Sequence, residues 1–305
     1  MKKLLLLLAM FCCLQANAAV RGDVNGDNNV DVSDINIVIN EILGKGGTYN
    51  ADVNGDGTTD VSDINIVINI ILGKDTPEDD HEYVDLGLPS GTLWATRNVG
   101  ANKPEDAGLY FAWGDTKGYA QGESHDFNWA NYKWMATGQS SLEYVIKYTF
   151  ADGQTNACWY NGNTYVGTTV NGVTYKDLRQ LLPEDDAATA HLGSAWCMPT
   201  NKQIEELINS NYTHTEWVTV NGVSGRKITS NSNGNSIFIP AYGYRYETGL
   251  YSVGIFGSYW SRDIFSGNCG GAFSLYFSVN AIVTFQDGRF SGQSVRAVRV
   301  EKAKR

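Results

Sequence analysis

Asp23-Val-Asn-Gly-Asp and Asp52-Val-Asn-Gly-Asp open two copies of one sequence unit near the N-terminus of the chain. Each copy continues with Asp-Val-Ser-Asp-Ile-Asn-Ile-Val-Ile-Asn, which begins at Asp31 in the first copy and at Asp60 in the second. Both copies end in Ile-Leu-Gly-Lys. Self-similarity at a fixed offset indicates one structural unit used twice. These two copies therefore decide the fold of this part of the chain.

Oxygen-bearing residues alternate along each copy, as they do in a calcium-binding loop. Calcium takes about six to eight oxygen ligands, and a 12-residue loop supplies them from positions 1, 3, 5, 7, 9 and 12. The expected ligands of the first loop are Asp23, Asn25, Asp27, the Asn29 carbonyl, Asp31 and Asp34. Those of the second loop are Asp52, Asn54, Asp56, the Thr58 carbonyl, Asp60 and Asp63. We expect two calcium ions, one in each loop.

Two loop positions depend on local geometry. The sixth position needs a left-handed backbone, which Gly57 adopts freely and Asn28 tolerates. The twelfth position is Asp34 or Asp63 instead of the usual Glu, so its shorter side chain reaches a metal only with a shift of the backbone. The alternative is a pair of Asx-rich turns that cap helices. That alternative does not account for oxygen ligands at every alternate position in both copies.

A short apolar helix is expected after each loop. Ser33 and Ser62 are the candidate N-caps, and Gly44 and Gly73 end the helices. The apolar side chains follow helical spacing at Ile35, Val38, Ile39, Ile42 and Leu43, and again at Ile64, Val67, Ile68, Ile71 and Leu72. Neither helix can bury its stripe alone, so we expect the two to pack antiparallel. So small a core needs the metal for much of its folding free energy.

This arrangement, with no helix entering the first loop, resembles the dockerin family over roughly residues 21–75. The Asp-Val-Asn-Gly-Asp opening and the Asp at the last loop position carry the resemblance. It implies calcium-dependent docking onto a cohesin-like domain of a partner protein. Recognition would then fall on Val32, Ser33, Val61 and Ser62. Because the two copies agree at these positions, the module is expected to bind in two orientations.

The chain departs from the dockerin pattern in the middle of each helix. Many dockerins carry a basic pair there, whereas this chain has Ile39-Asn40 and Ile68-Asn69. A partner other than a standard cohesin is therefore one open alternative. An internal spacer stiffened by calcium is another.

The first residues predict export. A positively charged start, the apolar residues 4–14 and Ala16-Asn-Ala18 have the form of a cleavable signal peptide over residues 1–18. The apolar run is shorter than the ~20 residues of a spanning helix, and no later segment reaches that length. Cys12 and Cys13 leave a lipoprotein anchor as the less favoured alternative, because bulky residues precede them. We expect a secreted or cell-surface protein.

Composition excludes one class of partner. The chain has 33 acidic and 23 basic residues and a formal net charge of −10, whereas nucleic-acid-binding domains carry a basic stripe. Three cysteines follow the signal peptide: Cys158, Cys197 and Cys269. An odd number leaves at least one unpaired, and the pairing stays open. The absence of a Cys-x-x-Cys motif argues against a zinc site.

The rest of the chain reads as a separate α+β domain. Residues 19–74 form the calcium module, the polar residues 75–82 a linker, and residues 83–305 the larger domain. Its alternating segments predict short strands at residues 216–220, 236–240, 272–277 and 294–300. Asn221-Gly222 and Asp287-Gly288 are expected hairpin turns. Two helices are expected, one within Tyr175–Leu192 and one from Thr200 to about Asn209, where Thr200 and Gln203 form a capping box.

Several phrases of this domain resemble one family over about residues 83–300. They are Tyr83-Val-Asp-Leu-Gly-Leu-Pro-Ser-Gly-Thr-Leu-Trp, Tyr110-Phe-Ala-Trp-Gly-Asp, Ala195-Trp-Cys-Met-Pro-Thr, Ile239-Pro-Ala-Tyr-Gly-Tyr-Arg, Tyr259-Trp-Ser and Gln293-Ser-Val-Arg-Ala-Val-Arg. Together they look like the FISUMP-type major paralogous domain of secreted bacterial proteins. That family is similar in fold to C-type lectins and to the formylglycine-generating enzyme. It implies architecture and surface location more than chemistry, and Cys197 stands where the family usually has Arg.

No catalytic motif is recognisable in the larger domain. His81, His125, His191 and His214 lie outside any nucleophile or metal motif, and only Cys269 lies where formylglycine-generating enzymes carry a cysteine pair. Aromatic residues instead suggest a binding surface, since flat rings suit sugar faces or protein hot spots. The candidates are Tyr242, Tyr244, Tyr246, Tyr251, Tyr259 and Trp260, and the alternative is that they fill the core.

The sequence as a whole predicts an exported protein without catalysis of its own. Its dockerin-like module would attach it to a partner in calcium, and its C-type-lectin-like domain would bind glycan or protein. The rival hypothesis is an enzyme or subunit of a secreted polysaccharide-degrading system of the O-glycosyl hydrolase class, because dockerins often accompany such enzymes. Paired carboxylates in a cleft would favour that rival.

Overall fold

The computed structural model describes residues 22–27, 29–47, 49, 51–53, 59–72, 82–151 and 159–300. It divides into two compact units, Met1–Thr76 and Pro77–Arg305. The expected signal peptide and all but the last residue of the expected linker lie outside the described residues. Within the described parts of the chain, no helix has both the length and the apolar character needed to cross a membrane. The two units are described separately below.

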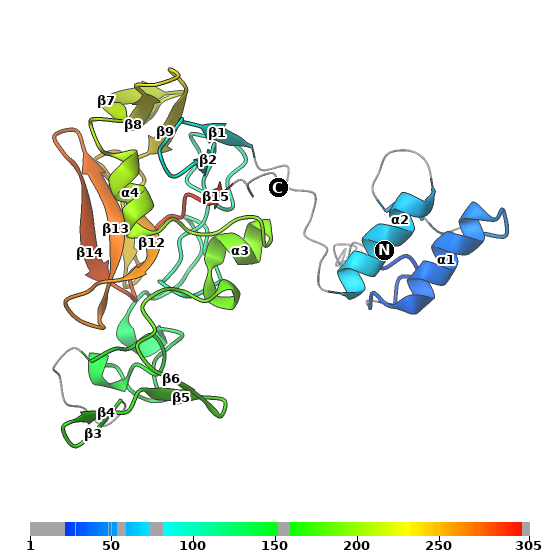
Figure 1. Cartoon of the computed structure of the whole chain (residues 1–305), viewed down its shortest axis with the longest axis horizontal. Coiled ribbons are helices and arrows are strands. Elements are labelled where there is room, and N and C mark those ends of the chain that lie inside the picture. The colour runs from blue at the N-terminus through cyan, green and yellow to red at the C-terminus, as the bar shows by residue number, and fades with distance from the viewer. Residues whose placement is uncertain are drawn as a thin grey trace, which may run out of the picture. The chain divides into compact units, whose positions relative to one another are not determined.

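The smaller unit contains two helices, α1 (Val32–Ile42) and α2 (Val61–Ile71), which pack side by side (Figure 1). Asp31 caps α1: its carboxylate accepts the N–H of Ser33 at 2.7 Å, and its own N–H donates to Asp34 at 2.9 Å. Our prediction of Ser33 and Ser62 as caps is therefore wrong, since both lie inside their helices. Asp31, two residues before Ser33, caps α1 because its oxygen reaches the first free N–H groups.

The core of the smaller unit is thin and uses loop residues as well as helix residues. Its buried members are Val24, Val38, Ala51 and Val67, packed against Val30, Ile35, Ile37, Val53 and Ile64. The predicted stripe is only partly correct, since its last three members are exposed in each helix: Ile39, Ile42, Leu43, Ile68, Ile71 and Leu72. Val24 and Ala51, which lie outside the helices, share this core with Val38 and Val67. Gly44 ends α1 with a φ of 68°, as predicted, and Gly73 lies outside the described residues.

In its described residues, the larger unit contains three three-stranded antiparallel sheets (Figure 1). The first joins β1 (Tyr83–Asp85), β2 (Thr92–Ala95) and β15 (Val298–Val300), so it brings the two ends of the unit together. The second consists of β7 (Thr213–Val220), β8 (Val223–Ser230) and β9 (Ser236–Pro240). The third consists of β12 (Phe256–Ile264), β13 (Gly271–Ser278) and β14 (Ile282–Gly288).

Hairpins and short helices complete the unit. The two-stranded pairs are β3 (Tyr160–Asn161) with β4 (Thr164–Tyr165), β5 (Thr168–Val170) with β6 (Val173–Tyr175), and β10 (Tyr244–Tyr246) with β11 (Gly249–Tyr251). The α-helices are α3 (Ala187–Leu192) and α4 (Asn201–Leu207), and the 3-10 turns are Trp129–Asn131, Leu142–Tyr144 and Pro183–Asp185. Mixed helices and antiparallel sheets make an α+β arrangement.

The local predictions succeed where a short motif decides the structure. The Thr200–Gln203 capping box starts α4, and Asn221-Gly222 turns β7 into β8. The helix predicted within Tyr175–Leu192 is wrong in its first half, because Tyr175 ends β6 and only Ala187–Leu192 is α-helical. The Asp287-Gly288 turn is also wrong: both residues pair with β13 at the end of β14.

Two arginines are buried in the core of the larger unit and bind carbonyl oxygens there. Arg289 donates to the backbone oxygens of Lys147, Tyr148 and Cys269 at 2.9 Å each, and to the Tyr132 hydroxyl. The Arg296 guanidinium donates to the backbone oxygens of Ala95, Thr96 and Phe238 and to the Asn98 amide oxygen. The planar fork of Arg289 holds segments outside the helices and strands, whereas that of Arg296 joins the end of β2 to β9. Arg296 therefore explains part of the Gln-Ser-Val-Arg-Ala-Val-Arg motif as architecture.

Candidate calcium loops and aromatic surface

The first loop folds on its own side chains. The Asp23 carboxylate accepts the N–H groups of Gly26 at 2.8 Å and Asp27 at 3.1 Å. The Asn25 amide oxygen accepts the Asp27 N–H at 2.8 Å, and the Asp27 carboxylate accepts the Asn29 N–H at 2.8 Å. Short polar side chains at alternate positions thus bend the backbone into a tight loop. The structure brings the side chains of loop positions 1, 3 and 5 into one turn.

Asp34, the last residue of the first loop, is fully buried. Its carboxylate accepts the N–H groups of Val24 at 2.8 Å, Asn25 at 3.0 Å and Asp31 at 2.9 Å. These three N–H donors stabilise the buried carboxylate and so offset the cost of its burial. They do so in place of a cationic side chain. The contact closes the loop, because it joins the last loop position to the second, third and ninth.

The second loop repeats this construction where it is described. Asp63 is fully buried, and its carboxylate accepts the N–H groups of Val53 at 2.8 Å and Asp60 at 2.9 Å. These distances match those from Asp34 to Val24 and Asp31. Asn54, Asp56 and Thr58 of the predicted ligand set lie outside the described residues.

The chemistry of the loop residues can be compared with the needs of calcium. Across the residues that the structure describes, no three Asp, Glu, His or Cys side chains gather as a metal cluster, and the carboxylates of Asp23 and Asp27 accept the loop's own N–H groups. The donors are nevertheless all oxygens, and a carboxylate keeps further lone pairs after accepting one N–H. The backbone N–H of Ser33 lowers the pKa of the exposed Asp31, which keeps that carboxylate ionised. The loop residues therefore fit a hard cation in kind.

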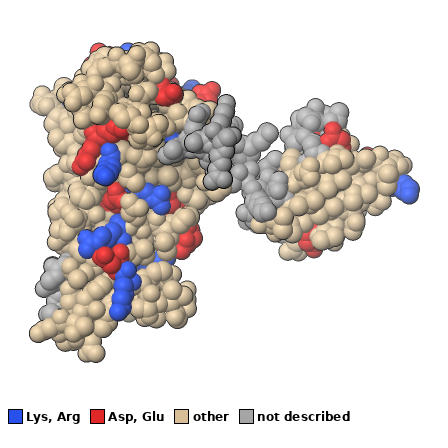
Figure 2. Space-filling view, viewed as in Figure 1, with Lys and Arg blue, Asp and Glu red and all other residues tan. Residues whose placement is uncertain are grey.

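The expected recognition residues are exposed in equivalent places in the two copies. Val32 and Val61 are each 62% exposed at the start of their helices. At the other ends, Leu43 is 60% and Leu72 is 58% exposed. Ser33 is exposed, and nothing is described of the Ser62 side chain. The face of this unit seen in Figure 2 carries few charged side chains. An apolar surface repeated by internal symmetry is typical of a protein-binding site.

The aromatic candidates of the larger unit divide into core and surface residues. Tyr259 and Trp260 are buried, and burial raises the pKa of Tyr259 to about 12. Tyr242 and Tyr244 are half-buried, whereas Tyr246 and Tyr251 are exposed. The alternative that the aromatic residues fill the core is thus correct for Tyr259 and Trp260. The sequence analysis missed Phe256, Tyr276 and Phe285, which share a surface with Tyr244 and Tyr251. Their signal was the alternation of residues within β12, β13 and β14.

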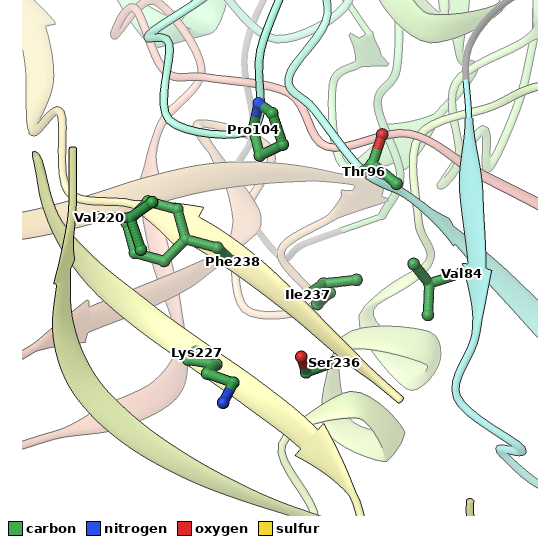
Figure 3. Close-up of a pocket in the computed structure, with 8 residues that line it drawn as sticks. All are labelled: Val84, Thr96, Pro104, Val220, Lys227, Ser236, Ile237 and Phe238. Atoms are coloured by element: carbon green, nitrogen blue, oxygen red, sulfur yellow. The ribbon is translucent and has the colours of Figure 1, made fainter. Parts of the chain in front are cut away.

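A cavity of about 280 Å³ lies beside β9 (Figure 3). It is mostly apolar, and its lining residues are Val84, Thr96, Pro104, Val220, Lys227, Ser236, Ile237 and Phe238. Its one charged side chain, Lys227, lies 3.5 Å from Glu216 in a surface ion pair. A lining with so few polar groups of fixed geometry gives little basis for specific recognition.

The titratable groups of the larger unit are engaged in structural contacts. Asp185 is buried and binds Lys147 at 2.6 Å, the Tyr148 hydroxyl at 2.5 Å and Lys133 at 3.2 Å. Burial, together with the bond to Asp185, raises the pKa of Tyr148. His191 contacts the Thr116 carbonyl at 2.9 Å. The Asp185 carboxylate, with three hydrogen-bond donors around it, has the contacts of a structural anchor.

The other histidines and the cysteines that the structure describes are engaged within the unit as follows. His125 stacks on Tyr119, and burial lowers its pKa. The His214 ring contacts Asn231 at 3.0 Å. Cys197 is a free thiol whose pKa is raised by burial. The Cys269 sulfur is buried and accepts the Phe150 N–H. His81 and Cys158 lie outside the described residues.

Comparison with known proteins identifies one part of the chain. The dockerin type I domain family matches residues 21–72, which span both loops and both helices. No curated protein and no solved structure matches the chain, so the FISUMP-type and C-type-lectin-like resemblance of the larger unit stays an expectation. Residues 21–72 are thus matched to a dockerin type I domain, which supports calcium binding and docking onto a cohesin partner.

Proposed function

We propose that this chain is an exported binding protein whose smaller unit docks, with calcium, onto a cohesin-like domain. The proposal also holds that the larger unit binds a glycan or a protein. The observation that carries it is the equivalence of the two copies. Each ties its loop with a buried Asp, Asp34 or Asp63, and each presents an exposed valine, Val32 or Val61, two residues earlier.

Two calcium ions are proposed, one held by each loop. The first would take oxygens from Asp23, Asn25, Asp27, the Asn29 carbonyl, Asp31 and Asp34. The second would take them from Asp52, Asn54, Asp56, the Thr58 carbonyl, Asp60 and Asp63. The ions would hold each loop on its helix, because charge repulsion between the carboxylates is then removed. The hydrogen bonds of Asp34 and Asp63 support a loop that is already closed in shape.

The proposed docking surface consists of Val32, Ser33, Val61 and Ser62, extended by the exposed apolar residues of the helices. Ile39 and Ile68, which stand where many dockerins have a basic residue, are both exposed. A partner that fits them must present apolar rather than acidic groups opposite the helices. Because Val32 and Val61 are equally exposed, either copy can take the same place on the partner. Binding in two orientations follows from this symmetry.

The test is binding of the full chain to immobilised cohesin domains, with calcium and with EDTA. Two orientations predict that Val32→Asp and Val61→Asp each reduce affinity by about twofold, since each leaves one orientation intact. The double variant should abolish binding. Val173→Asp is the matched control, because Val173 is 52% exposed in the other unit. Binding that survives the double variant, or that persists in EDTA, contradicts the proposal.

The rival function, hydrolysis of polysaccharides, calls for two carboxylates on either side of a bond. The cavity beside the exposed aromatic residues is lined by a single carboxylate, Asp287, among the residues that the structure describes. This supports binding in preference to cleavage at that place. Release of reducing ends from a panel of polysaccharides would favour the rival.

A further inference from the structure

Five aromatic rings form a row across the surface of the larger unit, which we call the aromatic ladder: Tyr251, Tyr244, Phe256, Tyr276 and Phe285. In that order, successive ring centroids lie 5.7, 5.6, 5.0 and 6.0 Å apart. Each ring comes from a different strand: β11, β10, β12, β13 and β14. The row thus crosses the β10–β11 hairpin and the whole third sheet.

Strand register explains why the rings share one face. Ser258 pairs with Tyr276, and Tyr276 pairs in turn with Val283. Side chains alternate between the two faces of a strand. Phe256, two residues before Ser258, and Phe285, two residues after Val283, therefore lie on the same face as Tyr276. The ladder follows from pairing rather than from neighbourhood in the sequence.

The opposite face of the sheet is covered. Leu275 and Phe277 point to that face and belong to a buried cluster with Ile204 and Leu207 of α4. On the ladder face, by contrast, Phe285 is 55% and Tyr251 is 44% exposed, while the three rings between them are half-buried. The ladder is therefore an open surface whose backing is a fixed core.

Gly243 lets the hairpin close onto the sheet. Its N–H donates to the Phe256 carbonyl at 2.8 Å, and its φ of 63° is one that other residues rarely adopt. A Cβ at this position would overlap the Tyr251 carbonyl. The close approach places Tyr244 against Phe256, with only 20° between the ring planes.

A cavity of about 250 Å³ lies along the middle of the ladder, and two polar side chains line it. They are Ser258 and Asp287, which accompany the rings of Tyr244, Phe256, Tyr276 and Phe285. The buried Gln293 holds both: its amide N–H donates to Asp287 at 2.9 Å, and its oxygen accepts the Ser258 hydroxyl at 2.8 Å. With its proton committed to Gln293, Ser258 presents an acceptor, and so does the Asp287 carboxylate.

We propose that the aromatic ladder binds a β-linked oligosaccharide of all-equatorial pyranose rings. Such rings have flat C–H faces that stack on aromatic side chains, and their edges carry hydroxyl groups that donate to Asp287 and Ser258. The exposed end rings, Phe285 and Tyr251, offer stacking surfaces to two sugars of one chain, and the cavity between them lies where further hydroxyl groups meet Asp287 and Ser258. This names the ligand class of the larger unit, and it rests on that half of the proposed function.

Ring angles favour a sugar over a cation. A quaternary ammonium group is held by aromatic rings that surround it as a box. The ladder rings instead follow one another in a row, with 29°, 20°, 41° and 50° between neighbouring ring planes, and do not enclose a box. The acceptors of Asp287 and Ser258 call for a ligand that donates hydrogen bonds. A flat ligand with hydroxyl groups along its edge satisfies both features.

The test is isothermal titration of the full chain with cellohexaose and xylohexaose, in calcium and again in EDTA. We expect saturable binding of at least one of them in both conditions. Phe285→Ala and Tyr251→Ala should each weaken it about tenfold, since each removes one stacking surface. Asp287→Asn should weaken it as well, because one acceptor becomes a donor. Tyr212→Ala is the matched control, an exposed tyrosine away from the ladder.

Absence of binding by either oligosaccharide at millimolar concentration overturns the proposal. Equal affinity of the ladder variants and the wild type also overturns it, and so does a loss that Tyr212→Ala shares. Phe285 and Tyr251 are exposed, so their variants keep the fold, which near-ultraviolet circular dichroism checks. The EDTA arm separates this inference from docking: failure here leaves calcium-dependent cohesin binding intact, and failure of docking leaves oligosaccharide binding intact.

Discussion

The buried carboxylate of Asp34 accepts a hydrogen bond from the backbone N–H of Val24 at 2.8 Å, which ties the end of the first loop to its beginning. Asp63 and Val53 repeat the bond at the same distance in the second loop. Hydrogen bonds within the chain thus close each loop without a cation. The predicted calcium ligands therefore lie in loops whose two ends are already joined by a hydrogen bond.

Replacement of Asp34 by Ala should therefore destabilise the smaller unit even in EDTA. Three N–H groups would lose their acceptor, which costs at least about 2 kcal/mol. Asp27→Ala is the control: Asp27 is also a predicted ligand but is exposed, so in EDTA its loss should cost less than about 1 kcal/mol. Amide hydrogen exchange over residues 22–44 measures the loss of stability in both variants. Equal protection in the two variants would show that Asp34 has no structural role of its own.

Loss of the Arg289 guanidinium should destabilise the larger unit strongly. Arg289→Lys keeps the charge but cannot reach four oxygens with a planar fork, so we expect a loss of at least about 3 kcal/mol in the free energy of unfolding. Lys227→Ala, which breaks an exposed ion pair at 3.5 Å, should cost about 0–1 kcal/mol. Chemical denaturation followed by tryptophan fluorescence compares them. A tolerated Arg289→Lys would assign the anchoring of these loops elsewhere.

Gly243 and Gly234 distinguish two effects of a missing Cβ. Both have a positive φ, but a Cβ at Gly234 meets nothing within 4 Å, whereas one at Gly243 overlaps the Tyr251 carbonyl. Gly234→Ala should cost about 1–2 kcal/mol of backbone strain. Gly243→Ala should cost more and separate Tyr244 from Phe256. Thermal unfolding measures the loss of stability in both variants. Oligosaccharide affinity measures the separation of Tyr244 from Phe256. Equal costs would mean that the hairpin can move away without loss.

Asp287 should give the larger unit a pH dependence of known sign. Burial raises the pKa of its carboxyl in the folded chain. The folded state then holds a charge that it disfavours at neutral pH, and this unfavourable contribution is relieved as pH falls through the raised folded pKa toward the unfolded value of ~3.9. Between pH 7 and pH 4, the wild type should gain stability relative to Asp287→Asn. A relative loss over this range would show that the pKa is lowered.

The smaller unit was largely readable from the sequence, because its chemistry is local and repeated. Alternating oxygens marked the loop, and the spacing of Val38 and Val67 marked the buried positions. The cap was misplaced by two residues, since Ser33 and Asp31 are both good caps and only the backbone decides between them. The exposure of Ile39 and Ile68 could not be predicted, because apolar spacing does not show which members of the stripe the small core reaches.

The larger unit was readable only in part, because its surface depends on pairing between distant strands. Asn221-Gly222 is a turn in the structure, but Asp287-Gly288 is not: the chain reverses between Ser278 and Ala281, where the Ser278 N–H donates to the Ala281 carbonyl at 2.8 Å. That register places Asp287 in the cavity of the ladder. Local turn propensity cannot contain this information, since register is fixed by the partner strand.

The central claim, that the twin loops each hold one calcium ion, is tested most directly by calorimetric titration of the full chain with calcium chloride. We predict two sites, of which Asp23→Ala removes one and Asp52→Ala the other, with no binding left in the double variant. Absence of heat up to millimolar calcium, or two sites that survive the double variant, would contradict the claim.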